Sequence, residues 1–246
     1  MPIHLHPPGH EETLTWVRRA SAPGLTESDL HLWRIPIAPP HPAEDQAGER
    51  FLPLLGEDQG GRALRMRDGP ARGRYIRSQA GLRRVLGLYL QAAPQSLRFR
   101  YGPAGKPFLL DAPPGFEFNL TTAHGLALVG ISLGSPLGVD CERIRPRRGL
   151  MGIAQRMFDP ARAAAMAALT PPEALTAFYL AWTALEADAK ADGRGLFRPR
   201  PPGAEPPQVR HCVPAPGYVA AVARARLPPV SGWRTLELGV EPRGDA

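Results

Sequence analysis

The chain carries 30 prolines and 26 glycines in 246 residues, and they follow no Gly-X-Y repeat. Proline fixes the backbone and removes a hydrogen-bond donor, while glycine adds backbone freedom, so both residues favour turns over long regular elements. Apolar residues make up 43% of the composition, which is enough for a packed core and excludes a disordered chain. The sequence therefore predicts short elements joined by rigid loops, in one large or two small domains.

The charge balance is basic, with a net charge of +7. Such a surface attracts nucleic acid, anionic lipid, phosphorylated cofactors or an acidic protein partner, and charge alone does not choose among them. Nearly all the basic residues are arginines, and the only lysines are Lys106 and Lys190.

Neither cysteine content nor hydropathy indicates a secreted or membrane protein. The two cysteines, Cys141 and Cys212, are too few for a disulfide framework or a cysteine-based zinc site, and we expect free thiols. No run approaches the roughly 18 apolar residues that span a bilayer, and residues 1–10 lack the apolar segment of a secretory signal. We expect a cytoplasmic protein that does not enter a membrane.

Helical and strand-like patterns alternate along the chain, which predicts an α+β fold. Residues 74–90 have apolar side chains at nearly helical spacing, with arginines on the other face. The segment Thr170-Pro171-Pro172-Glu173 is a capping box that opens a long helix through Ala191, and Gly193 is placed to end it. Strand-like runs are residues 30–37, 97–100, 108–110, 116–120, 126–132, 138–144, 218–222 and 235–238. Residues 1–60 otherwise look loop-rich, with a proline-rich connector at 38–47.

The helix-plus-strands pattern occurs twice. We therefore predict two α+β halves that join near residue 136, an N-terminal subdomain of residues 1–136 and a C-terminal subdomain of residues 137–246.

Two carboxylates share one face of the strand-like run at 138–144. Asp140 and Glu142 are two residues apart, so their side chains point the same way, while Val139 and Cys141 face the core. Two neighbouring carboxylates repel each other, and a hard dication such as Mg²⁺ removes the repulsion. The alternative is an exposed edge strand whose polar face is acidic.

A second set of charged residues lies on the capped helix. Trp182, Glu186 and Lys190 are spaced four residues apart and share one helix face. Taken alone, they favour a surface ion pair above a core tryptophan over the alternative, a metal-binding glutamate beside a phosphate-binding lysine.

Three weaker motifs complete the set. Gly105-Lys106-Pro107 forms a turn with one of the two lysines, and Phe118-Asn119-Leu120-Thr121-Thr122 ends a strand with hydroxyl and N–H groups suited to phosphate. The arginines Arg62, Arg65, Arg67, Arg72 and Arg74 form a basic cluster, either a solvated face or a phosphate-binding surface.

Taken in order, these motifs resemble the 4′-phosphopantetheinyl transferase superfamily, of the surfactin-synthetase-activating type. That pattern has a Gly-Lys-Pro turn, a Phe-Asn-Leu-Ser-His-Ser strand end, a Gly-(Ile/Val)-Asp-x-Glu strand and a Trp-x-x-Lys-Glu-x-x-x-Lys helix closed by Gly-x-Gly-Leu. Here the helix is closed by Gly193-Arg194-Gly195-Leu196, and the resemblance covers residues 62–223. It implies a monomer of two similar subdomains related by a pseudo-two-fold axis, with coenzyme A between them.

The resemblance also implies an activity, which is the Mg²⁺-dependent transfer of phosphopantetheine from coenzyme A to a serine of an apo carrier protein, with release of 3′,5′-ADP. Such carriers serve polyketide, non-ribosomal peptide or fatty-acid synthesis. By resemblance, Asp140, Glu142 and Glu186 would hold the metal, Glu186 would also act as general base, and Lys190 would neutralise the pyrophosphate. The expected coenzyme A contacts are Arg62, Lys106, Pro107, Asn119, Thr121, Thr122, Asp140, Glu186 and Lys190. Carrier contacts are expected in residues 193–217.

Two positions depart from the family pattern. Thr122 stands where the family has histidine, and we expect His124 to lie on the same strand face two residues later; Leu185 replaces the lysine before Glu186. These departures leave open a catalytically silent relative that binds coenzyme A or a carrier. A second alternative is a nucleic-acid-binding module built on the arginine cluster, although only Tyr75 interrupts those arginines as a stacking residue.

Overall fold

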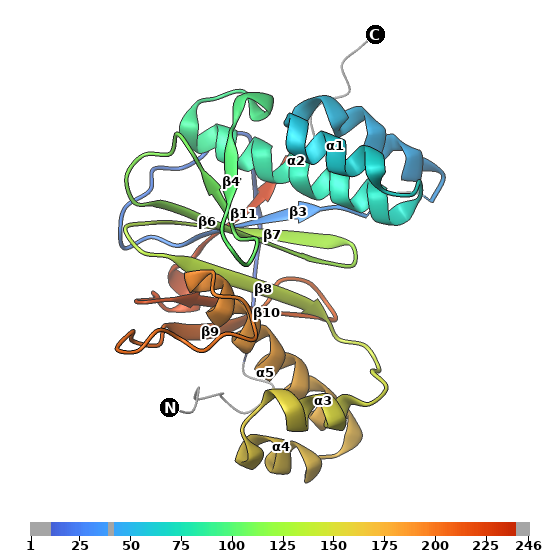
Figure 1. The fold of residues 1–246 in the computed structure, drawn as a ribbon, viewed down its shortest axis with the longest axis vertical. Coiled ribbons are helices and arrows are strands. Elements are labelled where there is room, and N and C mark those ends of the chain that lie inside the picture. Colours follow the sequence, from blue (N-terminus) through green and yellow to red (C-terminus); the bar gives the residue numbers. More distant parts are fainter. Residues whose placement is uncertain (1–10, 39–41, 240–246) are drawn as a thin grey trace.

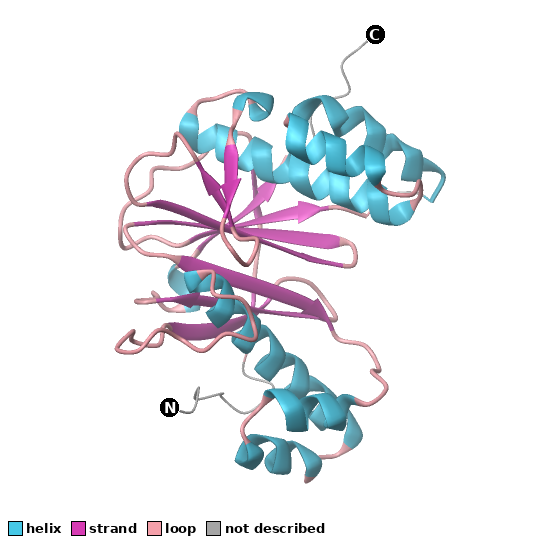
Figure 2. Ribbon diagram, in the orientation of Figure 1, coloured by secondary structure: helices cyan, strands magenta, loops and turns pink. Residues whose placement is uncertain are grey.

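The structure is a computed structural model that describes residues 11–38 and 42–239 (Figure 1). Two β-sheets occupy the centre, one above the other, and helices cover the outer side of each (Figure 2). The arrangement confirms the predicted α+β class. Residues 1–10, considered above for a secretory signal, lie outside the described part.

The first sheet has five strands in the order β2-β11-β3-β7-β6. They are β2 (Val17–Arg19), β11 (Arg234–Leu238), β3 (His31–Pro36), β7 (Leu126–Leu133) and β6 (Phe116–Ala123). Helix α2 (Pro70–Leu90) covers its outer face, where Leu82, Val85 and Leu86 pack against Trp33 and Val129. The helix begins with proline in its first turn, where the missing N–H has no cost, and ends at Gln91 in the left-handed conformation.

The second sheet has four strands in the order β1-β9-β10-β8. They are β1 (Glu12–Thr13), β9 (Gln208–Val213), β10 (Tyr218–Arg224) and β8 (Leu137–Arg143). Helix α5 (Pro171–Asp192) crosses this sheet through small side chains, with Ala187 and Ala191 packed on Ala221 and Ala223. Alanine against alanine lets the helix backbone lie close to the strands.

The inner faces of the two sheets form a shared core. Leu32 and Leu128 from the first sheet, with Leu30 just before β3, pack with Val139 and Val222 from the second. Cys141 and Cys212 lie in the same cluster as buried free thiols, as expected. This face-to-face packing fixes β8 between the first sheet and helix α5.

Smaller elements surround these layers. They are the 3₁₀ helices η1 (Pro42–Leu54), η2 (Pro94–Ser96) and η3 (Val230–Gly232), the helices α1 (Glu57–Arg65), α3 (Leu150–Met157) and α4 (Pro160–Ala167), and the hairpin of β4 (Phe99–Tyr101) and β5 (Pro107–Leu109). Helices α3 and α4 extend the lower end of the molecule around the first turns of α5 (Figure 1).

The long capped helix is confirmed. The Glu173 carboxylate accepts the Thr170 backbone N–H at 3.0 Å, and Gly193 ends the helix in the left-handed conformation with φ 70°. The strand-like runs also become strands with shifted ends, and the helix expected at 74–90 begins four residues earlier. Residues 1–60 are less loop-rich than predicted, because η1 and the start of α1 fall there; within the connector at 38–47, residues 39–41 lie outside the described part.

Each sheet includes one strand that is distant in sequence from its other strands. Strand β1, near the start of the described chain, pairs with β9 in the second sheet, and β11, near its end, pairs with β3 in the first sheet. The boundary between subdomains at residue 136 stays a prediction.

Among the described residues, no helix is both long enough and apolar enough to cross a membrane.

Candidate active site

A glycine brings helix α5 into contact with strand β8. A Cβ added to Gly138 would lie 1.9 Å from the carbonyl oxygen of Ala187 and 2.5 Å from the backbone nitrogen of Ala191. Only glycine tolerates this approach, because any side chain would overlap the helix backbone. The site is therefore built where one strand and one helix touch at their backbones.

Asp140 lies two residues beyond this contact and points into the junction of α5, β6 and β8. Its Oδ1 accepts from the ammonium of Lys190 at 2.5 Å and from the hydroxyl of Thr121 at 3.1 Å. The ammonium of Lys190 also lies 3.3 Å from an oxygen of Glu186. Strand β8 ends the order of its sheet, yet Asp140 is only 3% exposed, so the acidic face is not the solvated edge considered above.

The charges of this cluster perturb one another. Burial raises the pKa of Asp140 to about 7, and the carboxylates of Glu186 and Glu142 add to the rise while Lys190 opposes it. Burial and then Glu186 also raise the pKa of Glu142. Burial favours the neutral form of Lys190, but the charges of Asp140 and Glu186 outweigh it and raise its pKa, so Lys190 stays charged. Asp140 and Glu186 thus share the ammonium of Lys190, and Glu142 interacts with it only through longer-range electrostatics.

The carboxylates are not gathered into a finished metal site. In the part of the chain that the structure describes, no three His, Cys, Asp or Glu side chains form a metal-binding group. The ammonium of Lys190 lies between Asp140 and Glu186 instead. However, the second carboxylate oxygen of Asp140 is buried with no hydrogen-bond partner among the described residues. A buried, unpartnered carboxylate oxygen beside two further carboxylates fits a hard cation.

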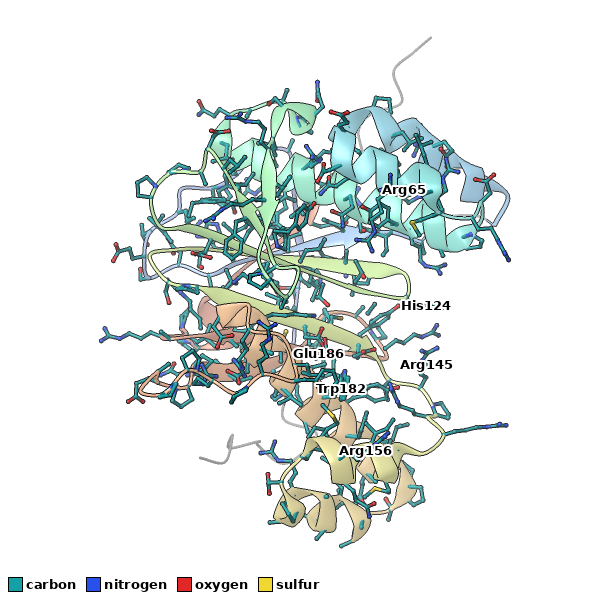
Figure 3. The ribbon with its side chains drawn as sticks, viewed as in Figure 1. Arg65, His124, Arg145, Arg156, Trp182 and Glu186 are labelled. Carbon is teal, nitrogen blue, oxygen red and sulfur yellow. The ribbon has the colours of Figure 1, made fainter. Side chains whose placement is uncertain are left out.

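A cavity of about 250 Å³ opens beside Glu186 and Lys190. Its lining includes Lys106 and Asn119, two of the predicted coenzyme A contacts, together with Leu120. Figure 3 shows Glu186 and Trp182 on α5, below strand β8. The structure therefore brings residues from α5, β6 and the Gly-Lys-Pro turn around one opening.

Both predicted contacts already have partners within the protein. The buried ammonium of Lys106 donates to the carbonyl oxygens of Leu137, at 3.2 Å, and Ala191, at 2.7 Å, and burial lowers its pKa. The side-chain oxygen of Asn119 accepts the backbone N–H of Val139 at 2.8 Å. These two side chains fasten β8 to α5 and to β6. Pro107 is half-buried at the start of β5, beside Lys106.

A second cavity has a volume of about 380 Å³ and is also lined by Leu120. It is lined by Arg62, Arg74, Thr122 and His124, and the guanidinium of Arg62 lies 5.2 Å from the ring centroid of Tyr75. Leu120 lines both cavities, so they are neighbours. The basic cluster is divided, because Arg72 pairs with Asp68 and Glu49.

The prediction that His124 lies on the same strand face as Thr122 is wrong. Strand β6 ends at Ala123, and His124 lies in the following turn with φ 52°, a left-handed conformation that a residue with a Cβ seldom adopts. From the turn it still lines the same cavity as Thr122. The physical reason is the tight hairpin between β6 and β7, which leaves only His124 and Gly125 to reverse the chain.

One contributor to the electrostatics was not singled out from the sequence. The guanidinium of Arg147 lowers the pKa of Glu142 against the effect of burial, and it lies 5.7 Å from the ring centroid of Trp182. The sequence feature that could have indicated Arg147 is the group of arginines that follows Glu142.

Comparison with known proteins agrees with this geometry. The sequence model described as the 4′-phosphopantetheinyl transferase superfamily matches residues 136–211, which contain β8, α5 and the acidic cluster. The chain is 33% identical over 186 residues to the 4′-phosphopantetheinyl transferase HetI of Nostoc sp., covering 75% of this chain and 77% of that relative.

More distant relatives have the same description. A putative 4′-phosphopantetheinyl transferase of Synechocystis sp. is 32% identical, covering 59% of this chain and 60% of its own length. The 4′-phosphopantetheinyl transferase Sfp of Bacillus subtilis is 24% identical, covering 64% of this chain and 69% of its own length. The motif order, the acidic cluster between β8 and α5, and these relatives together place the chain in the 4′-phosphopantetheinyl transferase superfamily, as an enzyme of that class.

Proposed function

We propose that this enzyme transfers the 4′-phosphopantetheine group of coenzyme A to a serine of an apo acyl or peptidyl carrier protein and releases 3′,5′-ADP. The observation that carries the proposal is the cluster of Asp140, Glu186 and Lys190: Glu186 and Lys190 line a cavity, and behind them one buried carboxylate oxygen of Asp140 has no partner among the described residues. Transfer of a phosphoryl-type group needs positioned charges more than covalent help, and this cluster supplies charges of both signs.

Asp140, Glu142 and Glu186 would hold one Mg²⁺. Burial, followed by the charge of Glu186, raises the pKa of Asp140 and of Glu142, and a dication offsets this cost of ionisation. When bound, Mg²⁺ would neutralise charge on the pyrophosphate of coenzyme A.

The protein's own side chains would carry the proton and orient the substrates. Glu186 would accept the proton of the carrier serine as the serine oxygen attacks the β-phosphorus of coenzyme A. The new serine O–P bond forms, and the bond from that phosphorus to the bridging oxygen breaks, so the electron pair leaves with 3′,5′-ADP. Lys190, which stays charged, would donate to the pyrophosphate oxygens as negative charge grows on the leaving group.

The two neighbouring cavities suggest how coenzyme A would lie. The pyrophosphate and pantetheine would occupy the cavity lined by Lys106, Asn119 and Lys190, and the nucleotide would extend past Leu120 to the cavity of Arg62 and His124. Pro107 and the backbone of Thr121 and Thr122 would line this path. Arg62 and Arg74, for which the described residues provide no ion-pair partner, suit phosphate groups of the nucleotide.

We also propose that the two halves are similar subdomains, of residues 1–136 and 137–246, related by a pseudo-two-fold axis. In support, one long helix crosses each sheet, α2 with 21 residues and α5 with 22. We expect the enzyme to act as a monomer on carriers of polyketide, non-ribosomal peptide or fatty-acid synthesis.

The test is intact-protein mass spectrometry of a panel of apo carriers incubated with the enzyme, coenzyme A and Mg²⁺. We expect a mass gain of one phosphopantetheine on at least one carrier, lost with a serine-to-alanine carrier and lost in the presence of a chelator. Absence of the gain on every carrier, with coenzyme A binding intact, would support the silent relative instead.

A further inference from the structure

Two arginines fix the loop that follows helix α5. Arg194 lies 2.6 Å from Asp188 and 2.5 Å from Asp192, and six residues later Arg200 pairs with the same two aspartates. Both aspartates belong to the last turns of α5. We call these four residues the clasp. Its side chains are between 13% and 30% exposed, so water screens these pairs less than pairs on an open surface.

The clasp closes a loop with an exposed aromatic ring at its apex. Phe197 lies midway between Arg194 and Arg200 and is 86% exposed, more than any other large apolar side chain among the described residues. Glycines at 193 and 195 adopt left-handed conformations that shape the loop, with φ of 70° and 80°. A ring held in water by a fixed loop loses little further entropy when a partner covers it.

Phe197 stands at the entrance to the active site. Its neighbours Gly195 and Leu196 line the cavity that also contains Glu186 and Lys190. The ring itself does not line this cavity, so it faces whatever approaches from solvent. A carrier protein must bring its serine to Glu186, and its surface around that serine would therefore meet this rim.

We propose that Phe197, presented by the clasp, is the apolar anchor on which the carrier protein docks. The proposal rests on the proposed function and extends it to the recognition of the protein substrate. The partner would offer an acidic surface beside its serine, with an aliphatic side chain that covers the ring. In support, the exposed Arg198 is adjacent to the ring, and the net charge of the chain, +7, attracts an acidic partner.

The first test compares Phe197→Ser with Phe197→Leu and with a control, Val17→Thr. Val17 is 52% exposed on β2, at the edge of the first sheet opposite β6, so the control removes exposed apolar surface far from the site. We expect Phe197→Ser to raise the KM for the carrier by about tenfold or more, with kcat and the KM for coenzyme A unchanged. Phe197→Leu should keep most of the wild-type affinity, and Val17→Thr should equal the wild type.

A second variant tests the clasp. Arg200→Gln keeps the ring but releases one end of its loop, and we expect an increase of roughly threefold in the KM for the carrier. Circular dichroism and thermal unfolding confirm that each variant is folded.

Binding measured without transfer separates this proposal from the proposed function. Calorimetric titration with a serine-to-alanine apo carrier should show the same loss of affinity in Phe197→Ser, even if no carrier is modified. An unchanged carrier affinity would overturn the proposal. So would a rise in the KM for coenzyme A alone, which would place the ring on the coenzyme, or a change of the enzyme from dimer to monomer in Phe197→Ser, which would make a second copy the partner.

Discussion

Replacement of Gly138 by alanine tests the central contact of the site. The new methyl would overlap the carbonyl oxygen of Ala187 at 1.9 Å, whereas ordinary van der Waals contact begins near 3.4 Å. The overlapping atoms belong to the helix backbone, which has no rotamer to change. Helix α5 would therefore have to move away from β8 by about 1.5 Å.

The magnitude follows from the contacts that this movement breaks. Overpacking of a core costs about 1–3 kcal/mol, and a backbone overlap belongs at the upper end, so we expect the free energy of unfolding to fall by about 3 kcal/mol. The contact of 2.5 Å between Asp140 and Lys190 joins the same strand and helix. A displacement of this size at a reacting centre costs about 100-fold in rate, and we expect that loss in phosphopantetheine transfer.

Urea denaturation and the mass-shift assay measure the two effects. The matched control is Gly152→Ala in α3, where an added methyl meets nothing within 4 Å; alanine there should stabilise the helix by about 0.5–1 kcal/mol without changing transfer. If Gly138→Ala unfolded within 0.5 kcal/mol of the wild type and kept its rate, our account of the glycine would be wrong.

Three further predictions concern single side chains. Glu186→Gln should fold normally but lose transfer by at least about 100-fold, because it removes both the proposed base and a metal ligand; a near-normal rate in the mass-shift assay would contradict both roles. Burial lowers the pKa of His31 from 6.5 to about 4. Between these pH values the unfolded chain binds a proton at His31 and the native state does not, so the free energy of unfolding decreases as pH falls from about 6.5 to 4. Urea denaturation at pH 7 and pH 5 should differ by about 2 kcal/mol more in the wild type than in His31→Gln, and equal differences would exclude the linkage. His124→Gly should relieve the left-handed strain and stabilise the protein by about 1 kcal/mol, yet raise the KM for coenzyme A several-fold; stabilisation without any change of KM would make His124 a turn residue only.

Local signals predicted the elements whose structure is decided locally. Helix α5 has a capping box, 22 residues and a terminal glycine, and each of these signals lies within its own sequence. Helices α3 and α4 have only eight residues each; Asp159 before Pro160 is a local start signal for α4, but both helices are held by packing of Phe158 and Met166 against Phe178 of α5. Packing between distant segments is not visible in a sequence window, so these helices were missed.

Pairing between distant strands was equally hidden. Strand β1 lies almost 200 residues before its partner β9, and β11 returns from the end of the chain to pair with β3. A pattern of alternating side chains predicts that a strand forms, but not which strand it joins. The predicted division into two halves therefore follows the order of the motifs along the chain, but it does not account for the pairing of β1 with β9 or of β11 with β3.

The candidate site shows a different limit. Spacing paired Asp140 with Glu142 and Glu186 with Lys190, and only the family resemblance joined the two sets; the structure places Lys190 in contact with both Asp140 and Glu186. Residue type did not indicate what Lys106 and Asn119 do, because their hydrogen bonds reach backbone groups of β8 and α5 that are remote in sequence. A lysine in a glycine-proline turn looks the same whether its ammonium faces a ligand or a carbonyl.

These contacts give the motifs a shared structural purpose. Gly138 lets α5 approach β8, Lys106 ties the Gly-Lys-Pro turn to both elements, and Asn119 ties β6 to β8. All three contacts fix the segment of β8 that carries Asp140, whose carboxylate must be held in place if it is to stay buried with one oxygen that no described residue contacts by a hydrogen bond. Residues of a motif can thus be required because they position the charged side chains, even where they touch no substrate. The order of the motifs is then explained at least as well by the need to hold β8 against α5 as by direct contacts with coenzyme A.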